Sequence, residues 1–209
     1  MPGDRDRPNS ISNEWFRVEF SRCEDRYAHV ISVNHATQAG ASRRFVPILK
    51  SLEGSAQEPW PPSPPLQSLH FENRPDGQQV ALLVGMSGDG HWSMSVELGP
   101  AASRSGQSLT EAADLAFDVA CRTRTVPARL GSLYRVLLPH LVDATGSVRF
   151  KLDDGQSQKP VCEMRVDQIS EPPCRIVGAE AGGLRIELTE FKDQRPMTYR
   201  WRYRLKAPG

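Results

Sequence analysis

Residues 80–98 read VALLVGMSGDGHWSMSVEL, and this stretch decides the fold class of the chain. Its second half, 91–98, places an apolar side chain at every second position. The polar residues between them are Ser93, Ser95 and Glu97. Alternation with period two is typical of a β-strand that buries one face. The preceding Asp89-Gly90 pair predicts a tight hairpin turn, because both residues of such a turn must reach positive φ.

A second Asp-Gly pair, Asp76-Gly77, follows the run 69–73 and precedes the run 80–84. Both runs are strand candidates, and the same turn chemistry separates them. We therefore expect an antiparallel meander of three strands, formed by 69–73, 80–84 and 91–98.

The hairpin also fixes which side chains share a face. In either two-residue register, Ala81 and Leu83 fall on the Trp92 face. The opposite face, which carries Ser93 and Ser95, receives Val80, Leu82 and Val84. Because both faces of this strand are apolar, we expect each of them to be covered. Two packed sheets, a barrel, or a sheet crossed by a helix meets this condition, whereas a single open sheet does not.

The rest of the chain carries the same strand signals. Further strands are expected at 16–20, 27–33, 147–152, 160–166, 175–179, 184–188 and 198–205. The pairs Asp154-Gly155 and Gly182-Gly183 mark turns between some of them. In total we expect about ten strands and one or two short helices, arranged as a mainly β antiparallel sandwich or barrel-like fold.

Three segments are ambiguous. The run 44–52 is apolar but contains Pro47, which favours an edge strand or a short irregular piece. The sequence from 108 matches a capping box, so a helical turn at 108–114 followed by a strand at 115–124 is our prediction, with a longer helix as the alternative. The segment 130–142 forms a strand or a short helix that Pro139 interrupts.

The chain divides into a short polar start and one large unit. Residues 1–13 lack periodicity and predict a disordered tail, and 14–209 predicts a single mainly β domain. The stretch 58–66, EPWPPSPPL, is rich in proline and should be extended polyproline II. We favour a stiff connector here over an exposed ligand for a proline-recognition domain.

Composition excludes several classes of protein. The 209 residues carry a net charge of +1, which argues against nucleic-acid coating and membrane-surface binding. No run reaches the ~20 apolar residues of a membrane helix, and no signal-peptide core is present at the N-terminus. The four cysteines form no C-x-x-C pair, so we expect reduced thiols in a soluble cytoplasmic protein, with Cys121 and Cys162 buried.

Recognisable catalytic and metal motifs do not occur in the sequence. The glycine-rich loop 85–90 precedes a strand, whereas a phosphate loop or nucleophile elbow needs a helix there. No two histidines share metal-ligand spacing, so we predict no metal and no cofactor. The candidates for a hydrolase with loop-borne residues are His91, Asp89, Asp118 and His140, and Ser87 with His91 and Asp89 is not a triad, because hairpin neighbours rarely reach that geometry.

Two surfaces are candidates for binding. If the face that carries Ser93, Ser95 and Glu97 lines a cavity, these residues and Asp118 would contact a ligand; if it meets solvent, they are ordinary surface residues. The C-terminal strand points Arg200, Arg202 and Arg204 to one side and aromatic residues to the other. This row would bind an anion or nucleic acid, or pair with acids across the ladder, and we expect 184–188 to form a hairpin with it that brings Glu187 opposite an arginine.

These observations favour a non-catalytic domain that binds a protein partner or a small ligand. A hydrolase at one end of the sandwich, and anion or nucleic-acid binding through the arginine row, are the alternatives. The sequence predicts neither the partner nor the oligomeric state.

Overall fold

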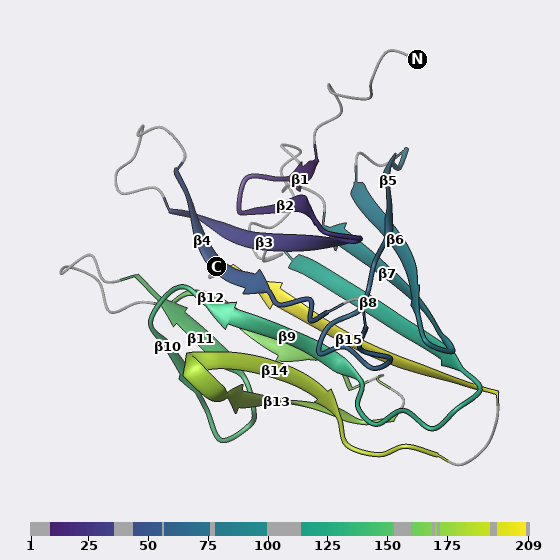
Figure 1. The fold of residues 1–209 in the computed structure, drawn as a ribbon. Coiled ribbons are helices and arrows are strands. Elements are labelled where there is room, and N and C mark those ends of the chain that lie inside the picture. Colours follow the sequence, from purple (N-terminus) through teal and green to yellow (C-terminus); the bar gives the residue numbers. More distant parts are fainter. Residues whose placement is uncertain are drawn as a thin grey trace.

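The structure is a computed structural model that describes residues 9–35, 44–55, 57–75, 78–99, 114–152, 160–168, 170, 172–192 and 196–207. Within these residues, fifteen strands form two antiparallel sheets that pack face to face, and a single turn of 3₁₀-helix is the one helical element (Figure 1). The predicted mainly β class is confirmed, and the arrangement is a sandwich rather than a closed barrel.

The first sheet has seven strands in the order β1-β2-β3-β4-β9-β14-β13. Their bounds are β1 Ser10–Ser12, β2 Phe16–Cys23, β3 Arg26–His35, β4 Arg44–Ser51, β9 Gly131–Val136, β14 Gly183–Leu188 and β13 Cys174–Ala179. The second sheet has eight strands in the order β10-β11-β12-β15-β8-β7-β6-β5. Their bounds are β10 His140–Val142, β11 Val148–Lys151, β12 Pro160–Val166, β15 Met197–Lys206, β8 Asp114–Thr123, β7 Gly90–Leu98, β6 Gln79–Ser87 and β5 Ser68–Asn73.

The predicted meander β5-β6-β7 is confirmed, with a corrected turn. Ser87 pairs with Gly90, so the loop is Gly88-Asp89 rather than Asp89-Gly90. Gly88 has φ +53°, and Asp89 does not share its positive φ. Glycine at the first loop position is typical of a type II′ turn. The two loop residues therefore lie one position earlier than the predicted Asp89-Gly90 pair. The Asp76-Gly77 turn lies outside the described residues.

The register also confirms which side chains of β6 and β7 share a face, but the exposure of these side chains differs from the prediction. Leu82 lies opposite Ser95 and Val84 lies opposite Ser93, as expected. The expectation that both faces of this strand are covered is wrong, because Leu82 is 37% exposed and Val84 is 53% exposed. Only the face with Ala81 and Leu83 packs into the sandwich, and Val80 is buried at the end of the other face.

The core lies between the two sheets and is rich in aromatic rings. Trp92 and Trp201 meet edge to face with ring centroids 6.1 Å apart. Phe117 stacks on Tyr203 at 4.8 Å with nearly parallel planes. All four of these side chains are buried, as the inward-pointing positions of β7, β8 and β15 require.

Pro47 does not make β4 an edge strand as a whole. The strand lies between β3 and β9, which corrects the prediction. However, β9 pairs with β4 only from Leu49 to Ser51, and the β3 register shifts between Ile31 and Ser32, where Pro47 pairs. The proline therefore lies outside the pairing with β9 and at an irregularity of the pairing with β3, where a missing N–H is tolerated.

The proline-rich stretch connects β4 of one sheet to β5 of the other. Ser63, Pro64 and Pro65 are buried, which supports the connector and contradicts an exposed proline-rich ligand. The Ser63 hydroxyl donates to the Leu133 carbonyl and accepts from the Leu133 N–H at 3.0 Å. These bonds give partners to the backbone N–H and carbonyl of Leu133, which lies in β9 beyond the residues that pair with β4.

Several predicted boundaries need correction. Ser10–Ser12 pairs with β2, so the tail predicted for 1–13 is ordered from its tenth residue, while 1–8 lie outside the described residues. Asp114 already belongs to β8, and the rest of the predicted helical turn at 108–114 is outside the described part of the chain, as is Asp154-Gly155. The segment 130–142 contains two strands, β9 and β10, rather than a helix.

The expected hairpin between 184–188 and the C-terminal strand is wrong. β14 pairs with β13 and β9 in the first sheet, whereas β15 pairs with β8 and β12 in the second. Glu187 consequently meets Arg175, at 2.8 Å, and not an arginine of β15. Strands that follow one another in sequence usually lie side by side. Here the chain instead crosses to the other sheet between β14 and β15.

Candidate functional site

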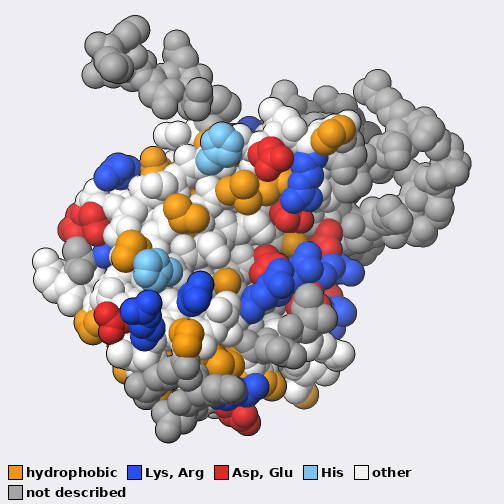
Figure 2. All heavy atoms as spheres, turned by 90° about the vertical axis from the view of Figure 1, so that its right-hand side faces the viewer, with side chains coloured by type: hydrophobic (Ala, Val, Ile, Leu, Met, Phe, Trp, Pro, Cys, Tyr) orange, Lys and Arg blue, Asp and Glu red, His pale blue; other side chains and the backbone are white. Residues whose placement is uncertain are grey.

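The outer face of the eight-stranded sheet gathers most of the predicted site residues. The register of β15, β8, β7 and β6 arranges their outward side chains in rows across the strands. These rows are Arg122-His91-Met86, Arg200-Ala120-Ser93-Val84, Arg202-Asp118-Ser95-Leu82 and Arg204-Ala116-Glu97-Val80. Figure 2 shows this side of the molecule, with hydrophobic side chains and histidines in the middle, a dense group of charged side chains at the right and further charged side chains at the left and near the lower histidine.

One predicted residue lies elsewhere. His140 is in β10, at the far edge of the same sheet, with β11, β12 and β15 between it and β8. Its ring lies 6.4 Å from the ring of Phe150. The structure therefore does not bring His140 together with His91, Asp89 or Asp118.

Ser93, Ser95 and Glu97 face outward and do not line an interior cavity. Ser93 is exposed, and Ser95 and Glu97 are half-buried. Ser93 and Ser95, together with Ala120, form a low strip of short side chains beside the exposed aliphatic side chains of β6. A ligand of this strip would bind on the surface.

The predicted arginine row is matched by acidic side chains. Arg200 forms a bidentate pair with Asp118, and this pairing raises the pKa of the guanidinium. Arg204 donates to Asp114 at 2.8 Å and to Asp167 at 2.5 Å. Arg202 lies 3.7 Å from the same Asp167 carboxylate. Three arginines thus face three aspartates, and the row presents little net charge to an anion.

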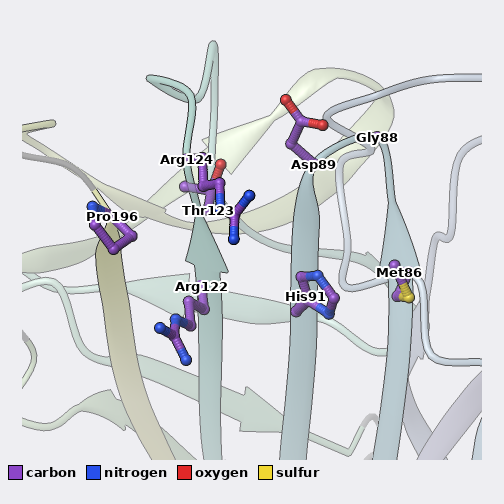
Figure 3. A pocket seen from close by; sticks show the side chains of 8 residues that line it. All are labelled: Met86, Gly88, Asp89, His91, Arg122, Thr123, Arg124 and Pro196. Atoms are coloured by element: carbon purple, nitrogen blue, oxygen red, sulfur yellow. The ribbon is translucent and has the colours of Figure 1, made fainter.

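A hollow opens at the turn end of this face. It has a volume of about 520 Å³ and lies where the β6–β7 turn, the end of β8 and the start of β15 meet. Its lining residues are Met86, Gly88, Asp89, His91, Arg122, Thr123, Arg124 and Pro196 (Figure 3). In Figure 3, His91 lies between Arg122 and Met86 on adjacent strands, and Asp89 stands on the turn above them.

Arg122 and Arg124 are functional candidates that the sequence interpretation missed. Both are exposed, and neither forms an ion pair with any residue that the structure describes. The signal was present in the run LAFDVACRTR, whose alternation places Asp118 and Arg122 on the same face. The missing information was the pairing of Arg122 with His91 across β7 and β8.

The arrangement of Ser87 agrees with the rejection of a triad. Ser87 is buried, and its hydroxyl donates to the carbonyl of Glu58 at 2.7 Å. Met86 and His91 point outward, so Ser87 lies on the opposite face from His91. Asp118 is held by Arg200 two rows away. None of these groups is placed to activate another.

A second polar group that sequence reasoning missed lies inside the sandwich. His29 Nε2 and the Tyr134 hydroxyl are 2.8 Å apart, and the Tyr134 and Tyr203 hydroxyls are 2.5 Å apart. The Trp201 indole N–H donates to Ser132 Oγ at 3.2 Å. Burial lowers the pKa of His29 to about 3 and raises the pKa of Tyr134 well above its usual range. The chain keeps a neutral imidazole between the sheets.

Glu53 lies beside this network, at the end of β4. The residue is half-buried, but its Oε1 is shielded from solvent and has no hydrogen-bond partner among the described residues. Burial raises its pKa to about 7, against the opposing effects of Ser51 and Arg26. No single sequence signal marks these residues, because they come together from both sheets.

The cysteines and possible metal ligands are dispersed. Cys121 and Cys162 are buried, as predicted, and burial raises the pKa of Cys121 to about 12. All four cysteines are free. Within the described ranges, no three His, Cys, Asp or Glu side chains come together as a possible metal site.

Comparison with known proteins gives no family. The sequence matches no protein-family model and no curated protein. In the described part of the chain, no helix has the length and apolar character needed to cross a membrane.

Proposed function

We propose that this protein is a non-catalytic binding module, and that its partner is a protein that docks on the outer face of β5–β8. The observation that carries the proposal is the line of exposed aliphatic side chains on β6. Leu82, Val84 and Met86 are 37%, 53% and 51% exposed, and they follow one another on alternate positions. No described residue covers them.

The chemistry of this face suits a protein partner. Isolated surface hydrophobic residues are common, but neighbouring ones on a regular strand form a patch, and such patches mark interaction sites. Each buried methylene contributes about 0.8 kcal/mol. The adjacent strip of Ser93, Ser95 and Ala120 is low, so a partner backbone or side chain can lie close to β7 and β8.

The charges at the turn end of this face favour a partner that carries acidic groups. The arginines of β15 are matched by aspartates, whereas Arg122 and Arg124 at the turn end have no ion pair with described residues. A complementary protein surface would have an apolar centre over β6 and acidic groups over this end. Complementary charge mainly sets orientation and association rate, and apolar burial supplies the affinity.

Site-specific photo-crosslinking tests the proposal. A photoreactive phenylalanine analogue replaces Val84 in the full chain, and a matched control places it at the exposed Glu19 of β2, on the other sheet. In cells that produce the protein, we expect one defined partner to crosslink from position 84 and not from position 19. An excess of unlabelled wild-type protein should suppress the adduct, whereas unlabelled Val84→Glu should not.

Two results would overturn this proposal. The first is equal crosslinking from both positions, or none from position 84. The second is an adduct of the chain with itself, accompanied by dimerisation in sedimentation experiments that Val84→Glu abolishes, because the occupant would then be a second copy.

The alternatives receive less support from the geometry. The hydrolase needs His140 and Asp118 beside His91, whereas His140 lies at the far edge of the sheet and Asp118 is paired with Arg200. Anion binding by the β15 row needs arginines that already pair with aspartates. A cytoplasmic location is also part of the proposal, and the four free cysteines support it.

A further inference from the structure

We infer that the hollow at the turn end of the outer face is an oxyanion site, which receives a phosphate or carboxylate group of the docked protein. The inference rests on the proposed function, since it assigns a chemical feature to the same partner. It is carried by the joint placement of Arg122, Arg124 and His91 around one hollow.

The charges of the hollow differ from those of the neighbouring arginine row. Its lining includes two guanidinium groups and one imidazole against a single carboxylate, Asp89. Neither arginine forms an ion pair with a described residue, and neither does Asp89. The excess of positive charge is therefore available to a ligand.

The geometry suits an oxyanion. Guanidinium groups present N–H donors in a planar fork that matches the oxygens of carboxylate and phosphate. Arg122 and His91 pair directly across β7 and β8, and Arg124 lines the same hollow just beyond the end of β8. Figure 3 shows the side chains of Arg122, Arg124 and His91 around the hollow, with Met86 at its apolar margin.

The size of the hollow indicates an attached group rather than a free ion. A volume of about 520 Å³ greatly exceeds one phosphate. Met86 is exposed and belongs both to this hollow and to the aliphatic line of β6. A protein that covers the aliphatic line would extend over Met86 and bring an anionic side chain to the arginines.

Titration of the assigned amide spectrum tests the inference with defined probes. Inorganic phosphate and acetate are added separately to the full chain, and sodium chloride is added as a control at the same ionic strength. We expect saturable shifts for the amides of Asp89, His91 and Thr123 with an oxyanion, but not with chloride. If phosphate alone causes shifts, the group that binds in the hollow is a phosphorylated one. If both probes cause shifts, a carboxylate is sufficient for binding.

Two double variants distinguish oxyanion binding in the hollow from general attraction to surface cations. Arg122→Gln with Arg124→Gln should weaken the binding at least tenfold, because the charge-assisted hydrogen bonds are lost. The matched control is Lys50→Gln with Arg135→Gln, two exposed cations that are neighbours across β4 and β9 without a hollow described between them. The control should leave the affinity within twofold.

Two outcomes overturn the inference: the absence of saturable shifts with either oxyanion, and equal weakening by both double variants. Because the same spectra report folding, a misfolded variant is recognised, and the single Arg124→Gln variant then replaces the double one. If crosslinking from position 84 succeeds while the oxyanion titration fails, only the inference falls. The reverse result removes the docked protein as the source of the oxyanion and leaves the hollow as a site for a free one.

Discussion

His29, which is buried, and Glu53, which is half-buried, should change the stability of this protein in opposite directions as the pH falls. Burial lowers the pKa of His29 from 6.5 to about 3. Burial raises the pKa of Glu53 from 4.5 to about 7. Unfolding restores both groups to water, so each shift makes the free energy of unfolding depend on pH.

The sign differs for the two residues. Between pH 6.5 and 3, the unfolded chain protonates His29 and the folded chain does not, so the folded state loses stability as the pH falls. Between pH 7 and 4.5, the folded chain protonates Glu53 and the unfolded chain does not, so stability rises as the pH falls. At about 1.4 kcal/mol per pKa unit, each effect reaches about 3 kcal/mol by pH 4.5.

In the wild type these effects largely cancel from pH 6.5 to 4.5, and the His29 effect alone remains below that range. Glu53→Gln removes one of them, so we expect the free energy of unfolding to fall by about 3 kcal/mol over the same interval. His29→Gln should give a rise of similar size. Urea denaturation followed by the fluorescence of the buried Trp92 and Trp201 measures both, and other carboxylates contribute equally to all three proteins.

The reasoning fails if Glu53→Gln and His29→Gln have the pH dependence of the wild type. If either variant does not fold, an NMR titration of the wild-type imidazole replaces it. His29 should remain neutral down to about pH 4, and protonation near pH 6 would contradict the burial argument.

Two further predictions test the register and the layer contacts. Leu83→Ala should cost about 2–5 kcal/mol of stability, whereas Val84→Ala, one position along, should stay within about 0.5 kcal/mol, as measured by urea denaturation; equal losses would contradict the assigned faces. Gly85→Ala should destabilise the fold by at least about 1–3 kcal/mol, because its Cβ would lie 1.8 Å from the Pro65 carbonyl oxygen. Gly178→Ala, whose Cβ meets nothing within 4 Å, is the control in the same thermal melts, and similar melting temperatures for the two variants would refute the close approach.

Local patterns predict strands and faces well in this chain. The alternation in 91–98 and in 198–205 places Trp92 and Trp201 inside, and the two rings meet in the core. The tight turn between β6 and β7 then fixes the register of their side chains. These features depend on residues close in sequence, where the pleat and the turn leave few alternatives.

Long-range pairing could not be predicted from the same patterns. Leu184–Leu188 alternates as well as any strand, but nothing local shows that it joins β9 in the other sheet. The polar group of His29, Tyr134 and Tyr203 has the same origin, because His29 and Tyr134 are 105 residues apart and Tyr134 and Tyr203 are 69 residues apart. Each residue alone fits an ordinary half-buried position, and only the packing of the two sheets brings them together.

The environment of β6 shows why the proposed binding surface is the hardest feature to predict. Period two establishes that Leu82 and Val84 share a face with Ser93 and Ser95, but it does not establish what lies over that face. Burial of such residues would stabilise the fold, and for this reason the sequence predicts that both faces of β6 are covered. The chain instead leaves them exposed beside uncompensated arginines, while it matches the arginines of β15 with aspartates. Exposed apolar groups and unmatched charge at one end of one face are best explained if the missing cover belongs to another protein.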